Sequence, residues 1–378
     1  MARTTRRKLL GVAGAAGTLA LLNSDPASGA SGVVSSARRP TFDRLPSRIA
    51  FGSCADQDKP QPIWDAVLAA DPELFIFLGD NIYGDTRDPA VLRAKYAQLA
   101  AQRGFRRLCQ RAPVLAVWDD HDFGEDDAGG DFPMKKIARQ IFCDFWNERA
   151  DSLRRTRDGI YDAVVLEAGG RRLQVIIPDL RFNRTALRRR QLGDMPYKTW
   201  AQRFEKDPLG VPGPYERNPD LAATMLGQAQ WRWLEQQLAQ PADVRIFASS
   251  VQVVADFPGW EGWSNFAADY QRLLQIIRRQ RANGLFCISG DMHYAEVSRQ
   301  DLNVPYPLWD FTSSGLTEVW ATPTPNALRV SSVLAEANFG LLTLDWSAPG
   351  GPTVRFEARD QQGRIRLSQA VNTADLAV

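Results

Sequence analysis

Short apolar runs that end abruptly in polar residues constrain the fold of this chain most strongly. Six of them have the length and continuous apolar character of strands that are covered on both faces. Helical periodicity fills several of the segments between them, so strands alternate with helices, as in an α/β layered fold. The six predicted strands lie at residues 49–51, 74–78, 114–118, 175–177, 244–248 and 285–288.

The segment after residue 294 has a different pattern, in which Gly and Pro separate short apolar runs. This pattern is typical of strands joined by turns. We therefore expect a second sheet that packs on the first, within a single mature domain over residues 48–378. The strands predicted for this sheet lie at residues 308–311, 341–346 and 354–358.

The N-terminus has the features of an export signal. Arg6 and Arg7 precede an apolar stretch over residues 9–22 that is too short to span a membrane, and small residues follow up to Ala30. This pattern predicts a twin-arginine signal peptide over residues 1–30, followed by a linker over 31–47. We expect the twin-arginine machinery to export the protein to the periplasm or beyond, with no transmembrane segment in the mature chain.

Composition excludes some classes of function. The 46 basic residues nearly balance the 44 acidic residues, and no long basic run suggests a nucleic-acid-binding patch. The run at residues 188–190 is interpreted as a solvated loop or the start of a helix. Four cysteines are too few for a disulfide scaffold, and Cys143 and Cys287 stand in apolar patterns typical of buried thiols.

The chain has only 2 histidines, His121 and His293, and both directly follow predicted strands beside aspartates. Carboxylates that converge on one crevice repel one another, and a bound cation is the usual compensation. The sequence therefore predicts a metal site at the carboxyl ends of the strands. Its motifs are Gly79-Asp80, Asp120-His121-Asp122 and Gly290-Asp291-Met292-His293.

The order of these motifs resembles that of the metallophosphoesterase superfamily. Gly52-Ser53-Cys54 and Tyr83, at positions where the superfamily pattern differs, resemble the alkaline phosphatase D (PhoD-like) family in particular, as does the run at residues 118–124. The runs at residues 179–181 and 227–234 are similar to that family's middle blocks. The resemblance implies a four-layer α/β/β/α fold of two mixed sheets flanked by helices.

The resemblance also implies a metal centre of iron(III) and calcium. Phenolate and thiolate favour a trivalent ion, and carboxylates suit a hard divalent ion. Asp126 stands where the family usually has an Asn, and Asp80 would bridge the two sites. The implied iron ligands are Cys54, Asp80, Tyr83 and His293, and the implied calcium ligands are Asp120 and Asp291 with Asp126 nearby.

The implied activity is hydrolysis of phosphate mono- and/or diesters by a metal-bound hydroxide. His121 would hydrogen-bond the phosphoryl oxygen or protonate the leaving group, and Asp122 would orient its imidazole. Arg181 would clamp the phosphoryl oxygens or, alternatively, form a structural salt bridge. Aromatic residues between 257 and 266, with Trp309 and Trp320, would line a leaving-group pocket or belong to the core.

The sequence leaves three alternative functions. The first is a phospholipase D-like diesterase that acts on lipid headgroups, and the second is a non-catalytic envelope protein that binds metal or phosphate. The third, serine hydrolysis by Ser53 or Ser250, is disfavoured because the sequence has no Gly-x-Ser-x-Gly elbow.

Overall fold

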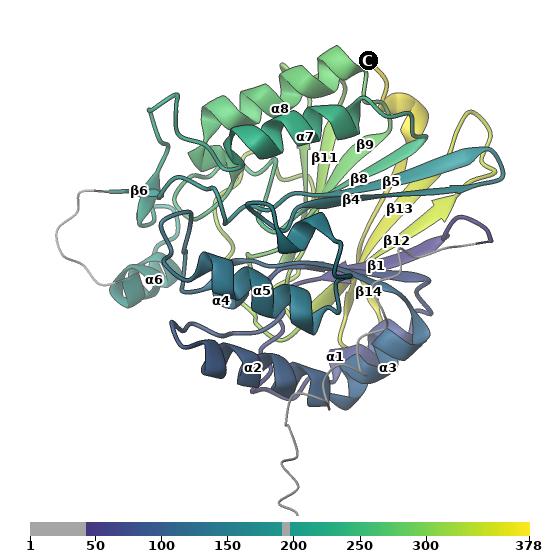
Figure 1. Ribbon diagram of the computed structural model, residues 1–378. Coiled ribbons are helices and arrows are strands. Elements are labelled where there is room, and N and C mark those ends of the chain that lie inside the picture. The colour runs from purple at the N-terminus through teal and green to yellow at the C-terminus, as the bar shows by residue number, and fades with distance from the viewer. Residues whose placement is uncertain (1–42, 191–196) are drawn as a thin grey trace, which may run out of the picture.

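A computed structural model describes residues 43–190 and 197–378. Two six-stranded mixed sheets pack together, and helices cover their outer faces (Figure 1). Phe311 in the second sheet and Phe356 in the first are stacked between the sheets, with ring centroids 4.8 Å apart. The predicted α/β fold of two mixed sheets flanked by helices is confirmed.

The first sheet has the strand order β14-β13-β12-β1-β2-β3. β1, β2 and β3 are parallel, and β12 pairs with β1 in the antiparallel direction. The carboxyl ends of the three parallel strands therefore meet at one edge of the sheet. The strands are β1 (Arg48–Gly52), β2 (Leu74–Leu78), β3 (Val114–Val117), β12 (Asn338–Asp345), β13 (Thr353–Asp360) and β14 (Ile365–Asn372).

The second sheet has the strand order β10-β11-β9-β8-β5-β4. Its four central strands are parallel, and β4 and β10 run antiparallel at the two edges. The strands are β4 (Asp162–Ala168), β5 (Arg171–Ile177), β8 (Val244–Ser249), β9 (Leu285–Ser289), β10 (Ala295–Gln300) and β11 (Leu308–Ser313). A separate pair, β6 (Arg188–Arg189) and β7 (Tyr215–Glu216), places the predicted solvated arginines in a short exposed strand.

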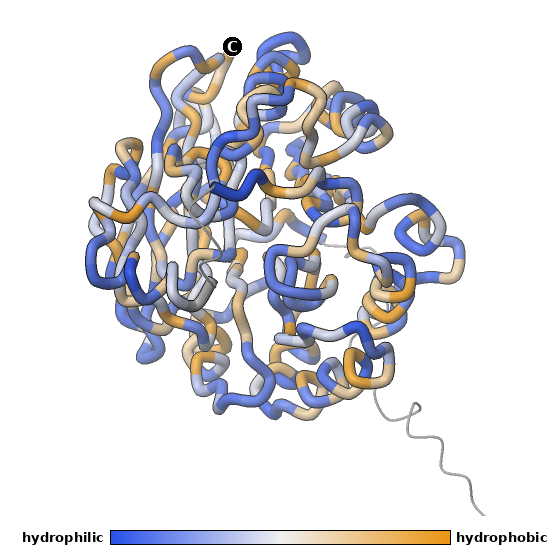
Figure 2. Tube along the Cα trace, turned by 90° about the vertical axis from the view of Figure 1, so that its left-hand side faces the viewer, coloured by the Kyte–Doolittle hydropathy of each residue, from blue (hydrophilic) through white to orange (hydrophobic). Residues whose placement is uncertain are grey.

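Helices pack on the sheets through large apolar side chains. Phe75 and Phe77 of β2 both contact Trp64, and Phe77 also contacts Phe105. The outer helices alternate between apolar and polar segments in Figure 2, as expected of helices with one buried face. The helices are α1 (Ile63–Ala69), α2 (Pro89–Ala101), α3 (Arg103–Arg111), α4 (Asp120–Phe123), α5 (Lys135–Phe145), α6 (Tyr197–Lys206), α7 (Gly227–Leu238) and α8 (Ala267–Gln280).

The prediction of a separate C-terminal sheet was wrong. β11 pairs with β9 in the second sheet, whereas β12 pairs with β1 in the first. The strands after residue 294 therefore complete both sheets, because each sheet needs further strands to satisfy the edges of β1 and β9.

Two further expectations concern the ends and the cysteines. The predicted signal peptide and most of the predicted linker lie outside the described residues. Within the described ranges, no helix is long and apolar enough to cross a membrane. All four cysteines are buried free thiols, as predicted for Cys143 and Cys287.

Candidate metal centre

The loops that follow β1, β2 and β9 bring three predicted ligands together. One ligand atom each from Cys54, Asp80 and His293 lies within 4.8 Å of the others. The Cys54 thiol is completely buried and donates a hydrogen bond to Asp80 Oδ2 at 3.5 Å. Burial, reinforced by the Asp80 carboxylate, raises the pKa of the Cys54 thiol well above its usual value. A thiolate here would therefore need a cation beside it.

Tyr83 adjoins this group. Its hydroxyl lies 3.1 Å from Nε2 of His293, and its ring lies against His121 with centroids 4.3 Å apart. Burial and the nearby Cys54 and Asp80 raise the pKa of the Tyr83 hydroxyl well above its usual value. The phenol oxygen is thus positioned to join the same donor set as the thiol.

Two more groups extend from the first. Asp80, Asp120 and His121 form the second, and Asp119, Asp120 and Asp291 form the third. Asp80 belongs to the first two groups and Asp120 to the last two. A carboxylate shared by adjacent groups is the arrangement that a bridging ligand between two metal ions requires.

Some buried carboxylate oxygens in these groups lack hydrogen-bond partners within the part of the chain that the structure describes. Oδ1 of Asp80 and Oδ2 of Asp119 are buried, yet neither has a hydrogen-bond partner among the described residues. Buried carboxylate oxygens without partners are costly unless a cation completes them. Carboxylate, thiol, phenol and imidazole donors in this arrangement therefore suit metal ions.

The electrostatics of the carboxylates point the same way. Burial, together with the charge on Asp120, raises the pKa of Asp80 well above its usual value, and burial raises that of Asp119 to about 6. Burial acts in the same direction on Asp120, but His121 and Arg181 outweigh it and lower the pKa of Asp120. Several carboxylates thus carry unfavourable negative charge that a metal ion would neutralise.

His121 is held by a residue that the sequence did not indicate. Its Nδ1 lies 2.7 Å from Oδ1 of Asp85, in the loop after β2. The predicted partner, Asp122, is buried and instead accepts hydrogen bonds from the backbone N–H of Asp119 at 2.6 Å and from the Asn81 side chain. Asp122 therefore fixes the loops after β2 and β3, and the carboxylate in contact with the His121 imidazole is that of Asp85.

Arg181 is completely buried and bonded to carboxylates. Its Nε donates to Asp119 at 2.6 Å, and its Nη2 lies 2.5 Å from Glu261 and 3.5 Å from Asp120. Arg184 also pairs with Glu261, at 3.0 Å. Of the two roles predicted for Arg181, this geometry matches the structural salt bridge, because the guanidinium is already engaged by these carboxylates.

Asp126 lies outside the three groups and is exposed. The next residue is more closely tied to them. The backbone N–H of Asp127 donates to Asp120 Oδ2 at 2.7 Å, and its carboxylate accepts from the Tyr215 hydroxyl. The acidic loop thus approaches the centre through Asp127 as well as through Asp126.

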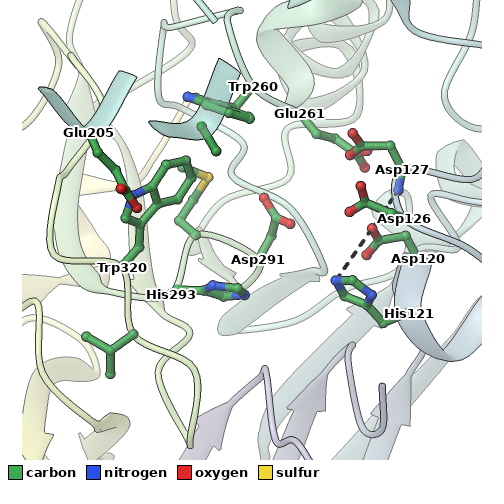
Figure 3. A pocket seen from close by; sticks show the side chains of 13 residues that line it. Asp120, His121, Asp126, Asp127, Glu205, Trp260, Glu261, Asp291, His293 and Trp320 are labelled. Carbon is green, nitrogen blue, oxygen red and sulfur yellow. Dashed lines mark hydrogen bonds and ion pairs between the residues drawn. The ribbon is translucent and has the colours of Figure 1, made fainter. Parts of the chain in front are cut away.

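A cavity of about 340 Å³ opens onto these residues (Figure 3). Asp291 and His293 lie in its middle. Four acids, Asp120, Asp126, Asp127 and Glu261, lie on one side, and the two tryptophans and Glu205 lie on the other. The lining residues are Asp120, His121, Asp126, Asp127, Ala201, Glu205, Trp260, Glu261, Asp291, Met292, His293, Val319 and Trp320.

Three residues near the centre were missed from the sequence. Asp119 stands inside the same Trp-Asp-Asp-His run as Asp120, so its position after a strand was a usable signal. Asp85 lies five residues after Asp80 in a polar loop, and Glu261 follows no predicted strand. No local pattern distinguishes these last two from ordinary surface acids.

Comparison with known proteins places this geometry in a family. The model of the PhoD-like phosphatase family matches residues 49–374. A structure described as that of PhoD has 16% identity and a TM-score of 0.63, covering 88% of this chain and 69% of that one. GAP50, the anchor in the inner membrane complex of Plasmodium, has 13% identity and a TM-score of 0.51, covering 87% and 89%.

At these identities the two structures support the fold alone. A search of curated proteins found no match. The family model, in contrast, spans most of the chain and includes every residue of the three groups. The chain therefore belongs to the PhoD-like phosphatase family.

Proposed function

We propose that this phosphoric ester hydrolase acts on phosphate mono- and diesters at a centre of iron(III) and calcium. The observation that carries the proposal is the chain of three adjacent ligand groups that share Asp80 and Asp120. When bound, the metals supply the Lewis acidity that polarises the ester and makes water a nucleophile at ambient pH.

The two metals are assigned by the chemistry of the donors. Thiol, phenol and imidazole donors gather around one side of Asp80 and favour a trivalent ion. Carboxylates predominate around Asp120, with His121 beside them, and favour calcium. We assign iron to Cys54, Asp80, Tyr83 and His293, and calcium to Asp80, Asp120 and Asp291 with Asp126 or Asp127 nearby.

The remaining residues position or move protons. His121 lines the cavity beside Asp120, so it is placed to hydrogen-bond the phosphoryl group or to protonate the departing alkoxide. Asp85 fixes the orientation of the His121 imidazole through its bond to Nδ1, so that Nε2 faces Asp120. Arg181 keeps the carboxylates of Asp119 and Asp120 in place.

We further propose that the protein is exported through the twin-arginine pathway to the periplasm or beyond. The support is the pair Arg6-Arg7 before a short apolar stretch. Fusion of residues 1–47 to a reporter protein tests this proposal. The reporter should leave the cytoplasm, and Arg6→Lys with Arg7→Lys should retain it there; export unaffected by that change would contradict the pathway.

The metal assignment is tested by the visible spectrum of the purified protein. A tyrosinate-to-iron(III) absorption band should be present and should disappear in Tyr83→Phe. Tyr270→Phe is a matched control, because the Tyr270 hydroxyl is buried without a hydrogen-bond partner among the described residues. Chelation should abolish hydrolysis of p-nitrophenyl and bis-p-nitrophenyl phosphate. A colourless, metal-free protein that still hydrolysed either ester would overturn the assignment.

A further inference from the structure

The cavity has two chemically different halves (Figure 3). One half contains the acids of the candidate metal groups. The other half is an apolar wall formed by Trp260 and Trp320, with Glu205 at its edge. Glu205 belongs to none of the three metal groups, so no proposed metal ion neutralises its charge.

The two tryptophans form a fixed corner. Their ring centroids are 4.9 Å apart, and the rings are inclined at 76° to each other. Phe204 of α6 is completely buried behind them, with its ring 5.4 Å from Trp260 and 5.7 Å from Trp320. This packing anchors α6 and holds the next residue, Glu205, at the rim beside Trp320 (Figure 3).

The apolar wall is also tied to the proposed iron ligands. The backbone N–H of Trp320 donates to the carbonyl of His293 at 3.0 Å, and that of Thr317 donates to the carbonyl of Cys54 at 3.0 Å. The position of the wall relative to the reacting phosphorus is therefore set by the backbone of the metal loops. A group bound at the wall would lie in the same cavity as the candidate metal ligands.

The charge of the lining residues decides what that group is. Among the described residues, no lysine or arginine lines the cavity, and the two arginines behind it are paired with Glu261. A carboxylate beside tryptophan rings repels a second anionic group and attracts a cation, because the faces of the rings are also electronegative. Ammonium groups on short alcohols have the size and charge to fit such a corner.

We propose that Glu205, Trp260 and Trp320 bind the ammonium group of a phosphodiester in which one alcohol is an amino alcohol. This inference rests on the proposed hydrolysis and specifies its substrate class. The oxygen of water forms a new bond to phosphorus, and the bond from phosphorus to one ester oxygen breaks. The departing oxygen takes one proton of the water, and the other is released from the product phosphate.

Two esters that differ only in charge test the proposal. p-Nitrophenyl phosphocholine and p-nitrophenyl 3,3-dimethylbutyl phosphate have the same shape, but only the first carries a positive charge. The wild-type protein should have a kcat/KM about tenfold higher for the choline ester, which corresponds to ~1.4 kcal/mol. Glu205→Gln and Trp320→Leu should each reduce this ratio to about two or below.

Asp207→Asn is the matched control, because it removes a negative charge from the same segment outside the cavity. The Asp207 side chain accepts a hydrogen bond from the N–H of Gly210 at 2.9 Å, and an asparagine oxygen can accept it equally. The control should keep the wild-type ratio. Equal turnover of the two esters by the wild type, or a ratio unchanged in both test variants, would overturn the ammonium site and leave the proposed function standing. Turnover of neither ester, together with no turnover of p-nitrophenyl or bis-p-nitrophenyl phosphate, would overturn the proposed function.

Amino alcohol diesters occur as soluble molecules and as lipid headgroups. Glycerophosphocholine and phosphatidylcholine vesicles distinguish the two sources, with choline and phosphocholine release as the measurement. Faster cleavage of one of them, lost in Glu205→Gln, would support the site and assign its source. Cleavage of neither would contradict the assignment of amino alcohol esters as substrates.

Discussion

Four proposed ligand residues have a left-handed backbone, which residues other than glycine rarely adopt. Such a conformation costs about 1 kcal/mol or more at each position and persists where the surrounding structure enforces it. At these residues the chain turns sharply after the preceding strand, so that their side chains converge. The residues and their φ values are Cys54 (63°), Asp80 (45°), Asp291 (76°) and His293 (60°).

The loss of stability caused by bringing these carboxylates together can be tested at Asp291. Burial, together with the charge on Asp119, raises the pKa of Asp291 well above its usual value, so this carboxyl group lowers the stability of the metal-free fold at pH 7.5. Asp291→Asn should therefore raise the melting temperature of the chelated protein while lowering its calcium content and its activity at least 100-fold. The exposed substitution Asp301→Asn should change none of these; a chelated Asp291→Asn protein that melts earlier would refute the repulsion argument.

The bond between His121 and Asp85 gives a second prediction. Asp85→Asn keeps the shape of the side chain but weakens its hold on the imidazole. Removing such a supporting partner typically costs 10- to 100-fold, and here kcat should fall by about that factor with the metal content unchanged. Metal analysis beside steady-state kinetics checks it. Full activity in Asp85→Asn would show that His121 needs no partner.

At this scale the sequence indicates ligands that directly follow strands and little else. Asp120 and His293 were predictable because polar residues after apolar runs meet at one edge of a sheet. Glu261 was not predictable, because it reaches the site through ion pairs with Arg181 and Arg184, which depend on the packing of distant loops.

At the scale of elements, strands were more predictable than their pairing. β2 begins and ends where its apolar run does, since a covered strand needs a continuous apolar segment. The pairing of β1 with β12 joins residues nearly 300 positions apart, and no local pattern encodes it. The expected separate C-terminal sheet failed for this reason.

The turn after β2 allows a prediction about an element boundary. Gly79 has a φ of 94°, and a Cβ there would lie 2.5 Å from Cβ of Asp119. Gly79→Ala should cost about 2–4 kcal/mol of stability and reduce metal content, because strain and overlap add. Gly169→Ala, in the β4–β5 turn, has a φ of 59° but nothing within 4 Å, so it should cost about 1 kcal/mol. Denaturant titration compares them; equal costs would contradict the role of overlap.

At the scale of the whole molecule, the metal centre joins the two sheets. Cys54 and Asp80 follow strands of the first sheet, and Asp291 and His293 follow β9 of the second. A Cβ at Gly290 would lie 2.8 Å from the carbonyl of Leu78, so the loops are packed closely. Metals that bind only this closed arrangement should stabilise both sheets together. Chelation should lower the melting temperature in one cooperative transition, and loss of a single sheet alone would contradict this.

The pH dependence of the metal-free protein follows from the same loops. Burial raises the pKa of Asp122 to about 7. Burial alone would lower the pKa of His121, but the charges on Asp120 and Asp80 outweigh burial and raise the pKa of His121 to about 12. Both pKa values exceed those of the unfolded chain, so the folded state binds more protons and gains stability as pH falls from 8 to 6.5, on the order of 2 kcal/mol. Below pH 6.5 His293 opposes the gain, because burial lowers its pKa to about 4.

In the metal-loaded protein the dependence should reverse, because protons compete with the metals for the same side chains. Melting temperatures at pH 8.0, 7.25 and 6.5, with and without chelator, measure both slopes. Asp122→Asn should reduce the slope of the chelated protein, since an amide does not titrate, and leave the share due to His121. Asp65→Asn, whose side chain is 76% exposed, should leave the slope unchanged. Parallel slopes with and without metal would mean that these buried groups do not face the ions.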